Sequence, residues 1–255
     1  GAVVACALIH VDDLLIAWND GLFDINLVRK ALEWRNWLEA PQSIDWNGRE
    51  IHFVPHLPRG WKAIITVSKY LRSRRPSVLN KQRADDSPLD FSDRSEMKGI
   101  VGDLQYAAST CRPDLSGGTS LIQRCELTMD ELRQANELLK HALQTSDCGI
   151  TITPLIVSRM VVVGYGHSSF ANADEMRTQI AMLVVVSDCA CLEGEAPGSI
   201  MSWASNRTKR VIRSTLAGES CAADNAADNA VYVAAFFREF YFRKRSTRGN
   251  ADIQL

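Results

Sequence analysis

The sequence lacks an apolar run long enough to cross a lipid bilayer. Its opening segment, "GAVVACALIHV", is too short for a transmembrane helix and has no cationic start of the kind found in a secretory signal peptide. We therefore expect no association with a membrane. The segment reads instead as a β-strand, and because it begins abruptly we expect the chain to be a piece of a longer polypeptide, cut at both ends.

Cysteine pairs and a strong net charge are absent too. The seven cysteines are scattered, without a Cys-x-x-Cys pair or neighbouring histidine pairs, which argues against a disulfide framework or a zinc site. The 29 basic and 30 acidic side chains give a formal charge of −1. Any attraction for nucleic acid must therefore come from local clusters. The 255 residues, 46% of them hydrophobic, suffice for a folded core.

The first part of the chain predicts a hairpin followed by a helix. Residues 2–18 read as two strands joined by a two-residue turn at Asp12-Asp13. Residues 23–38 then place apolar side chains at helical spacing, which predicts an amphipathic helix over that whole range.

The middle of the chain predicts mainly helices. Two short strands are expected around a turn at 58–60, followed by a short basic helix at 68–75. Residues 76–95 are polar and form the best candidate for a linker. A helical block follows over about 96–145, ending in a helix at 129–144 with a clear apolar side.

From residue 150 the hydrophobic period changes. Three β-type runs precede one long helix, which we expect to begin near Ser214-Thr215, where a hydroxyl can cap it. The helix carries a predicted apolar stripe of Leu216, Ala223, Ala227, Ala230, Ala234, Phe237 and Tyr241. Together with an alternating segment at the end of the chain, this order of elements predicts an α/β layer. We therefore place a domain boundary near residue 150.

The stretch "ALIHVDDLLIAW" holds the most distinctive polar residues. Asp12 and Asp13 stand between two apolar runs, although a carboxylate is costly to place beside a hydrophobic core unless something neutralises it. One interpretation is the solvated tip of an acidic turn. The other is a pair that holds a divalent cation such as Mg²⁺ beside substrate phosphates.

Several segments, in order along almost the whole chain, resemble those of copia-type LTR retrotransposon Pol polyproteins. "HVDDLLIAW" resembles the "YVDD" motif of their reverse transcriptases. The resemblance continues through "WNGREIHF", "PRGWKAIITVSKYL", "MKGIVGDLQYAASTCRPDLSGGTSLIQR" and "ELLKHALQTSDCGITI". It ends in "GYGHSSFANADEMRTQIAM" and "MSWASNRTKRVIRSTLAGESCAADNA", which resemble ribonuclease H segments.

The resemblance implies a chain of mixed α+β and α/β class. Residues 1–75 would be the C-terminal part of a reverse-transcriptase palm, and 76–150 a linker with a helical thumb or connection. Residues 151–255 would be a three-layer ribonuclease H-like domain that stops before its last strands and helices. The implied partners are an RNA template, a DNA primer and an RNA–DNA hybrid, with Mg²⁺ as cofactor, in cytoplasmic virus-like particles or the nucleus.

In the polymerase part, the resemblance implies that Asp12 and Asp13 are the catalytic, metal-binding pair. His10 stands where the family has a tyrosine. The partner aspartate of that site lies upstream in the family and is not in this sequence. Because two-metal chemistry requires several converging acids, we expect this half of the site to be inert by itself.

In the ribonuclease H part, Glu219 matches the catalytic, metal-binding glutamate. The family's first catalytic aspartate falls at His167, and an imidazole cannot replace a carboxylate that bridges hard Mg²⁺ ions. We therefore predict that His167 and Glu219 approach each other in a charge-assisted pair. The alternative is that Glu219 is an ordinary acid at a helix start, favoured by the helix dipole.

Two basic clusters are candidates for contacts with nucleic acid. Arg207, Lys209, Arg210 and Arg213 precede the long helix, and Arg72, Arg74 and Arg75 end the short basic helix. Solvated surface faces explain both clusters equally well. We interpret Arg112-Pro113-Asp114 as a structural break, with Pro113 starting a helix.

These expectations leave three interpretations open. The first is a fragment of a reverse transcriptase and ribonuclease H in which neither activity remains, because both carboxylate sites are incomplete. The second is a non-catalytic remnant that binds nucleic acid or an RNA–DNA hybrid. The third is an excerpt of a longer, active protein.

Overall fold

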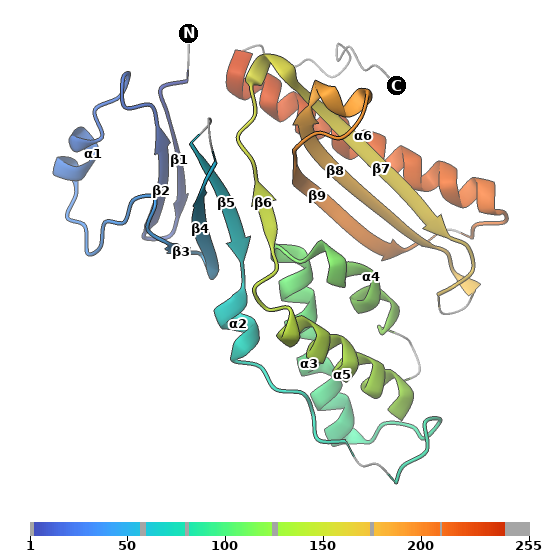
Figure 1. Ribbon diagram of the computed structural model, residues 1–255. Helices are drawn as coiled ribbons and strands as arrows, with labels where there is room; N and C mark the ends of the chain where they lie inside the picture. The colour runs from blue at the N-terminus through green and yellow to red at the C-terminus, as the bar shows by residue number, and fades with distance from the viewer. Residues whose placement is uncertain are drawn as a thin grey trace.

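The computed structural model describes residues 3–56, 60–79, 82–123, 127–173, 176–209 and 211–242. These residues form three antiparallel sheets, with strand orders β1-β2, β3-β4-β5-β6 and β7-β8-β9, together with six α-helices (Figure 1). The predicted mixture of α and β structure is confirmed. None of the described helices is long and apolar enough to span a membrane.

The first sheet is a hairpin of β1 (Ala5–His10) and β2 (Asp13–Trp18). The predicted hairpin is confirmed, but its turn lies one residue earlier than predicted. His10 pairs with Asp13, so the turn residues are Val11 and Asp12. Val11 takes a positive φ of 53°, which a tight hairpin turn requires and which a β-branched residue rarely adopts.

The predicted helix over 23–38 is wrong over most of its length, because α1 spans only Asn26–Ala31. Side-chain contacts fold the following segment back instead of continuing the helix. The indole N–H of Trp34 donates to the carbonyl of Val28 at 3.3 Å, and that of Trp37 donates to Glu39 at 2.7 Å. Helical periodicity is a weak signal, and side-chain contacts of this kind can override it.

The second sheet contains one strand that the sequence did not reveal. Its strands are β3 (Ile44–Trp46), β4 (Arg49–Pro55), β5 (Trp61–Thr66) and β6 (Ile150–Ile152). The missed strand, β3, turns into β4 through Asn47-Gly48, both with positive φ. Most of the predicted turn at 58–60 lies outside the described residues, and the predicted basic helix is α2 (Ser68–Arg72).

The helical block has the predicted order. It consists of α3 (Phe91–Thr110), α4 (Pro113–Leu121) and α5 (Met129–Gln144). The last matches the predicted helix residue for residue, and a reciprocal capping box of Thr128 and Glu131 fixes its start. The completely buried leucines Leu71, Leu104, Leu115, Leu132 and Leu139 form the centre of the core. Pro113 starts α4 as predicted.

The third sheet contains β7 (Met160–Ser169), β8 (Gln179–Asp188) and β9 (Gly198–Arg207). Short 3₁₀ turns lie at Val157–Arg159 and Cys189–Leu192. The long helix α6 (Thr215–Phe242) covers one face of this sheet (Figure 1). The predicted cap is confirmed, because the hydroxyl of Ser214 accepts a hydrogen bond from the Ala217 amide at 3.1 Å.

The predicted apolar stripe of α6 is confirmed in part, because Ala230 and Phe237 pack against the core beneath the helix, but its first half differs. Gly218, Ala222, Ala226 and Val233 face inward, whereas the predicted members Leu216, Ala223 and Ala227 are exposed. The reason is a close approach of backbones that only small residues permit. A Cβ atom at Gly166 would lie 2.5 Å from the carbonyl oxygen of Ala222.

The other side of the third sheet meets the helical block. Trp203 on β9 packs against the core of that block, and its indole N–H donates to the carbonyl of Ala108 at 2.7 Å. In addition, β6 pairs with β5 although it follows the helices in sequence. The residues beyond 150 therefore share both a sheet and a core with the preceding ones. The division at 75 and 150 stays a prediction.

Candidate functional site

Glu219 lies in the second turn of α6, beside the end of β7. The Ser168 hydroxyl donates to its Oε1 atom at 2.9 Å, and the Ser168 amide N–H donates to the same atom at 3.2 Å. Nδ1 of His167 lies 3.3 Å from that oxygen. The prediction that His167 and Glu219 approach each other is thus confirmed. Gly218 permits this packing, because a Cβ atom there would lie 2.7 Å from the Ser168 hydroxyl.

This arrangement does not suit a magnesium ion. Mg²⁺ requires an octahedral shell rich in oxygen ligands, whereas one oxygen of Glu219 already accepts two hydrogen bonds and its titratable neighbour is an imidazole. Across the described ranges, no three His, Cys, Asp or Glu side chains gather into a group that could hold a metal. The side chain of His167 is 81% exposed and that of Glu219 38% exposed, so water can reach the pair.

The hairpin residues Asp12 and Asp13 lie far from this pair. Both are exposed, and they line an open cavity of about 730 Å³ beside β2. The β1-β2 hairpin lies at the opposite end of the molecule from the third sheet (Figure 1). His10 pairs with Asp13 across the ladder, and its ring contacts Trp46 edge-on at 6.2 Å between centroids. In the part of the chain that the structure describes, no third acid completes a metal-binding group here.

The basic cluster before α6 is only partly available. Arg207 donates to the backbone carbonyl of Gln123 and is therefore held against the helical block. Lys209 and Arg213 are exposed, and neither forms an ion pair with another described residue. Arg210 lies outside the described residues.

The cluster after α2 has mainly structural contacts. Arg72 donates twice to Asp147 at 2.7 Å, which ties α2 to the turn before β6. The Arg74 guanidinium lies 4.2 Å from the centre of the Tyr70 ring and pairs with Asp103. Burial and a hydrogen bond to Asp103 raise the pKa of Tyr70 to about 12.

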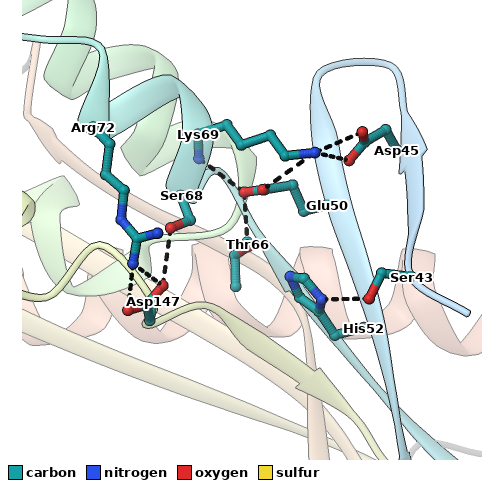
Figure 2. Close-up of polar contacts among 9 residues, drawn as sticks. All are labelled: Ser43, Asp45, Glu50, His52, Thr66, Ser68, Lys69, Arg72 and Asp147. Carbon is teal, nitrogen blue, oxygen red and sulfur yellow. Dashed lines mark hydrogen bonds and ion pairs between the residues drawn. The ribbon is translucent and has the colours of Figure 1, made fainter.

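A polar network that no sequence pattern predicted holds α2 in place (Figure 2). The buried carboxylate of Glu50 accepts from the amide N–H of Lys69 at 2.9 Å and from the Thr66 hydroxyl at 3.3 Å. The Lys69 ammonium bonds both oxygens of Asp45, at 2.7 and 2.9 Å, and this hydrogen bonding raises the pKa of Lys69. The network caps a helix and carries no catalytic arrangement.

The described residues form a mixed fold of α-helices and β-strands, in which the Glu219 carboxylate on α6 accepts hydrogen bonds from Ser168 at the end of β7. No family model matches this chain, and no solved structure matches it. The chain is similar to the retrovirus-related Pol polyprotein from transposon RE2 of Arabidopsis thaliana, with 25% identity over 251 residues. The matched region covers 94% of this chain and 16% of the relative. This similarity supports a relationship to retrotransposon Pol polyproteins.

Proposed function

We propose that this chain is a segment of a copia-type retrotransposon Pol polyprotein that joins the end of a reverse transcriptase to a ribonuclease H-like domain. The similarity to a transposon polyprotein, which extends over 94% of the chain, supports this assignment. So does the order of three antiparallel strands followed by α6, with Glu219 near the start of that helix. The proposed ancestral substrates are an RNA template and an RNA–DNA hybrid.

We further propose that the ribonuclease H-like site is catalytically silent. The observation that carries this proposal is the 3.3 Å approach of His167 to Glu219, in a site that hydrolysis would require to be rich in carboxylates. The Ser168 hydroxyl and amide hold the carboxylate where a metal ion would otherwise be its partner. The Asp12–Asp13 pair is proposed to be silent as well, because no further described acid joins it.

The test is an activity assay on the purified polypeptide of residues 1–255. An end-labelled RNA–DNA hybrid and a primed RNA template are incubated with the protein and Mg²⁺, beside an active ribonuclease H and an active reverse transcriptase. We expect neither RNA fragments nor extended primer. Cleavage that is abolished in the Glu219→Gln variant would contradict the proposal, because contaminating nuclease would not respond to that change.

A second candidate function is non-catalytic binding of nucleic acid. The observation in its favour is the pair of exposed cations Lys209 and Arg213 beside the start of α6. If they contact phosphates, the Lys209→Ala/Arg213→Ala variant should bind a hybrid more weakly and reduce the salt dependence, the slope of log K against log[salt], by about 2. Replacement of the exposed Lys98 on α3 by alanine is the matched control. No hybrid binding at low salt would exclude this function.

A further inference from the structure

The cavity beside the hairpin has a lining that the proposed function does not explain. Four of the six tryptophans of the chain lie around it, from β2, the segment after α1, and β3. They are Trp18, Trp34, Trp37 and Trp46. Its volume of about 730 Å³ lies within the range typical of small-molecule sites.

The same lining is negatively charged. Of its four acids, Asp45 is neutralised by the Lys69 ammonium at 2.7 Å. Asp12, Asp13 and Glu33 form no ion pair with any residue in the described ranges, and Arg35 is the basic side chain in the lining. A cation that enters the cavity therefore meets three unpaired carboxylates against one guanidinium.

Two of the indole rings contact each other, and one of them also contacts an arginine. Trp34 and Trp37 lie edge to face, with centroids 5.3 Å apart and planes at 77°. The guanidinium of Arg29 lies 4.6 Å from the centre of the Trp37 ring, so this indole takes part in a cation–π contact within the chain, which occupies one of its two faces.

We propose that this cavity binds an organic cation, an alkylammonium or guanidinium group, in preference to Mg²⁺. Aromatic faces attract large, weakly hydrated cations, and the carboxylates supply the compensating charge. A magnesium ion instead keeps a tight octahedron of oxygen ligands and strongly bound waters, and the four indoles supply no oxygen ligand. This proposal does not depend on the retrotransposon assignment, because it rests on the lining alone.

The test compares three probes on the purified chain: tetramethylammonium, neopentyl alcohol as its neutral counterpart of similar shape, and Mg²⁺. Indole fluorescence and the indole N–H signals in ¹H–¹⁵N NMR spectra report binding. We expect a saturable change with tetramethylammonium and an affinity at least about tenfold lower for the neutral probe, as a cation–π contribution implies.

Variants locate the effect in the cavity. Trp37→Leu should weaken tetramethylammonium binding about tenfold, whereas Trp61→Leu, a change of an exposed indole outside this lining, should leave it unchanged. The Asp12→Asn variant alters only an exposed turn residue, so it should retain the fold, verified by its melting temperature, and bind the cation more weakly. Equal binding of the neutral probe, preferred binding of Mg²⁺, or no saturable change would each overturn the proposal.

Discussion

Arg112 is the largest side chain that the structure buries almost completely, and replacing it with methionine should destabilise the helical block. Its guanidinium donates to both carboxylate oxygens of Asp114, at 2.9 and 2.7 Å. It also donates to the Thr145 carbonyl at 2.9 Å and to the Thr145 hydroxyl at 2.8 Å. One side chain thus joins the α3–α4 break to the end of α5.

The magnitude follows from how exposed the remaining partners would be. Removing one member of a fully buried ion pair costs about 3–5 kcal/mol. Arg112 is 1% exposed but the side chain of Asp114 is 48% exposed, so water can solvate the carboxylate that is left behind. Methionine also retains the apolar contacts of the arginine stem. We therefore expect Arg112→Met to lower the free energy of unfolding by about 2–3 kcal/mol, mainly because the two hydrogen bonds to Thr145 are lost.

The assay is urea unfolding at equilibrium, followed by far-UV circular dichroism. Arg75→Met is the matched control, because among the described residues that exposed guanidinium bonds only to nearby backbone carbonyls. Its loss should change the free energy of unfolding by no more than about 0.5 kcal/mol. If Arg112→Met lowers the free energy of unfolding by less than about 1 kcal/mol, this arginine does not join the three helices in the way described.

Other changes test separate parts of the fold. Burial alone would raise the pKa of Asp114, but the hydrogen bonds and charge of Arg112 hold this pKa below its usual 3.8. The stability that the pair contributes should therefore be lost as the pH falls through the lowered pKa. Urea titrations at several pH values should show that the stability of the Arg112→Met variant is less sensitive to acid. Gly166→Ala should lower the free energy of unfolding, measured by thermal unfolding, by more than about 2 kcal/mol, because the added Cβ atom would meet the α6 backbone. Gly99→Ala is the control, since a Cβ atom there lies in open space on α3, and this change should be neutral or stabilising. Burial raises the pKa of Cys111 to about 11, so mass spectrometry after iodoacetamide treatment of the native protein should find Cys148 alkylated and Cys111 intact.

Local signals were sufficient where short-range chemistry determines the structure. The helix at 129–144 was predicted to the residue, because its capping box and apolar side lie within one segment. The start of α6 was predicted by its capping hydroxyl. The approach of His167 to Glu219 was also predicted, although only through the resemblance to ribonuclease H segments.

Features that depend on competing local contacts or on distant neighbours were not predictable from one sequence. The segment after α1 has helical spacing, yet its indoles bond to the nearby residues Val28 and Glu39, and the helix ends early. The inward stripe of α6 is set by Gly164 and Gly166 on β7, which admit its backbone, and periodicity cannot identify such neighbours. The cavity at the hairpin was missed for the same reason, because its tryptophans come from separate elements.

A magnesium titration followed by ¹H–¹⁵N NMR shows directly whether β7 or a metal ion holds the Glu219 carboxylate. The amide of Ser168 donates directly to that carboxylate and is the reporting signal. We expect that this signal does not move in a saturable way as Mg²⁺ is added to the wild-type chain. A saturable, site-specific shift that disappears in the Glu219→Gln variant would contradict it.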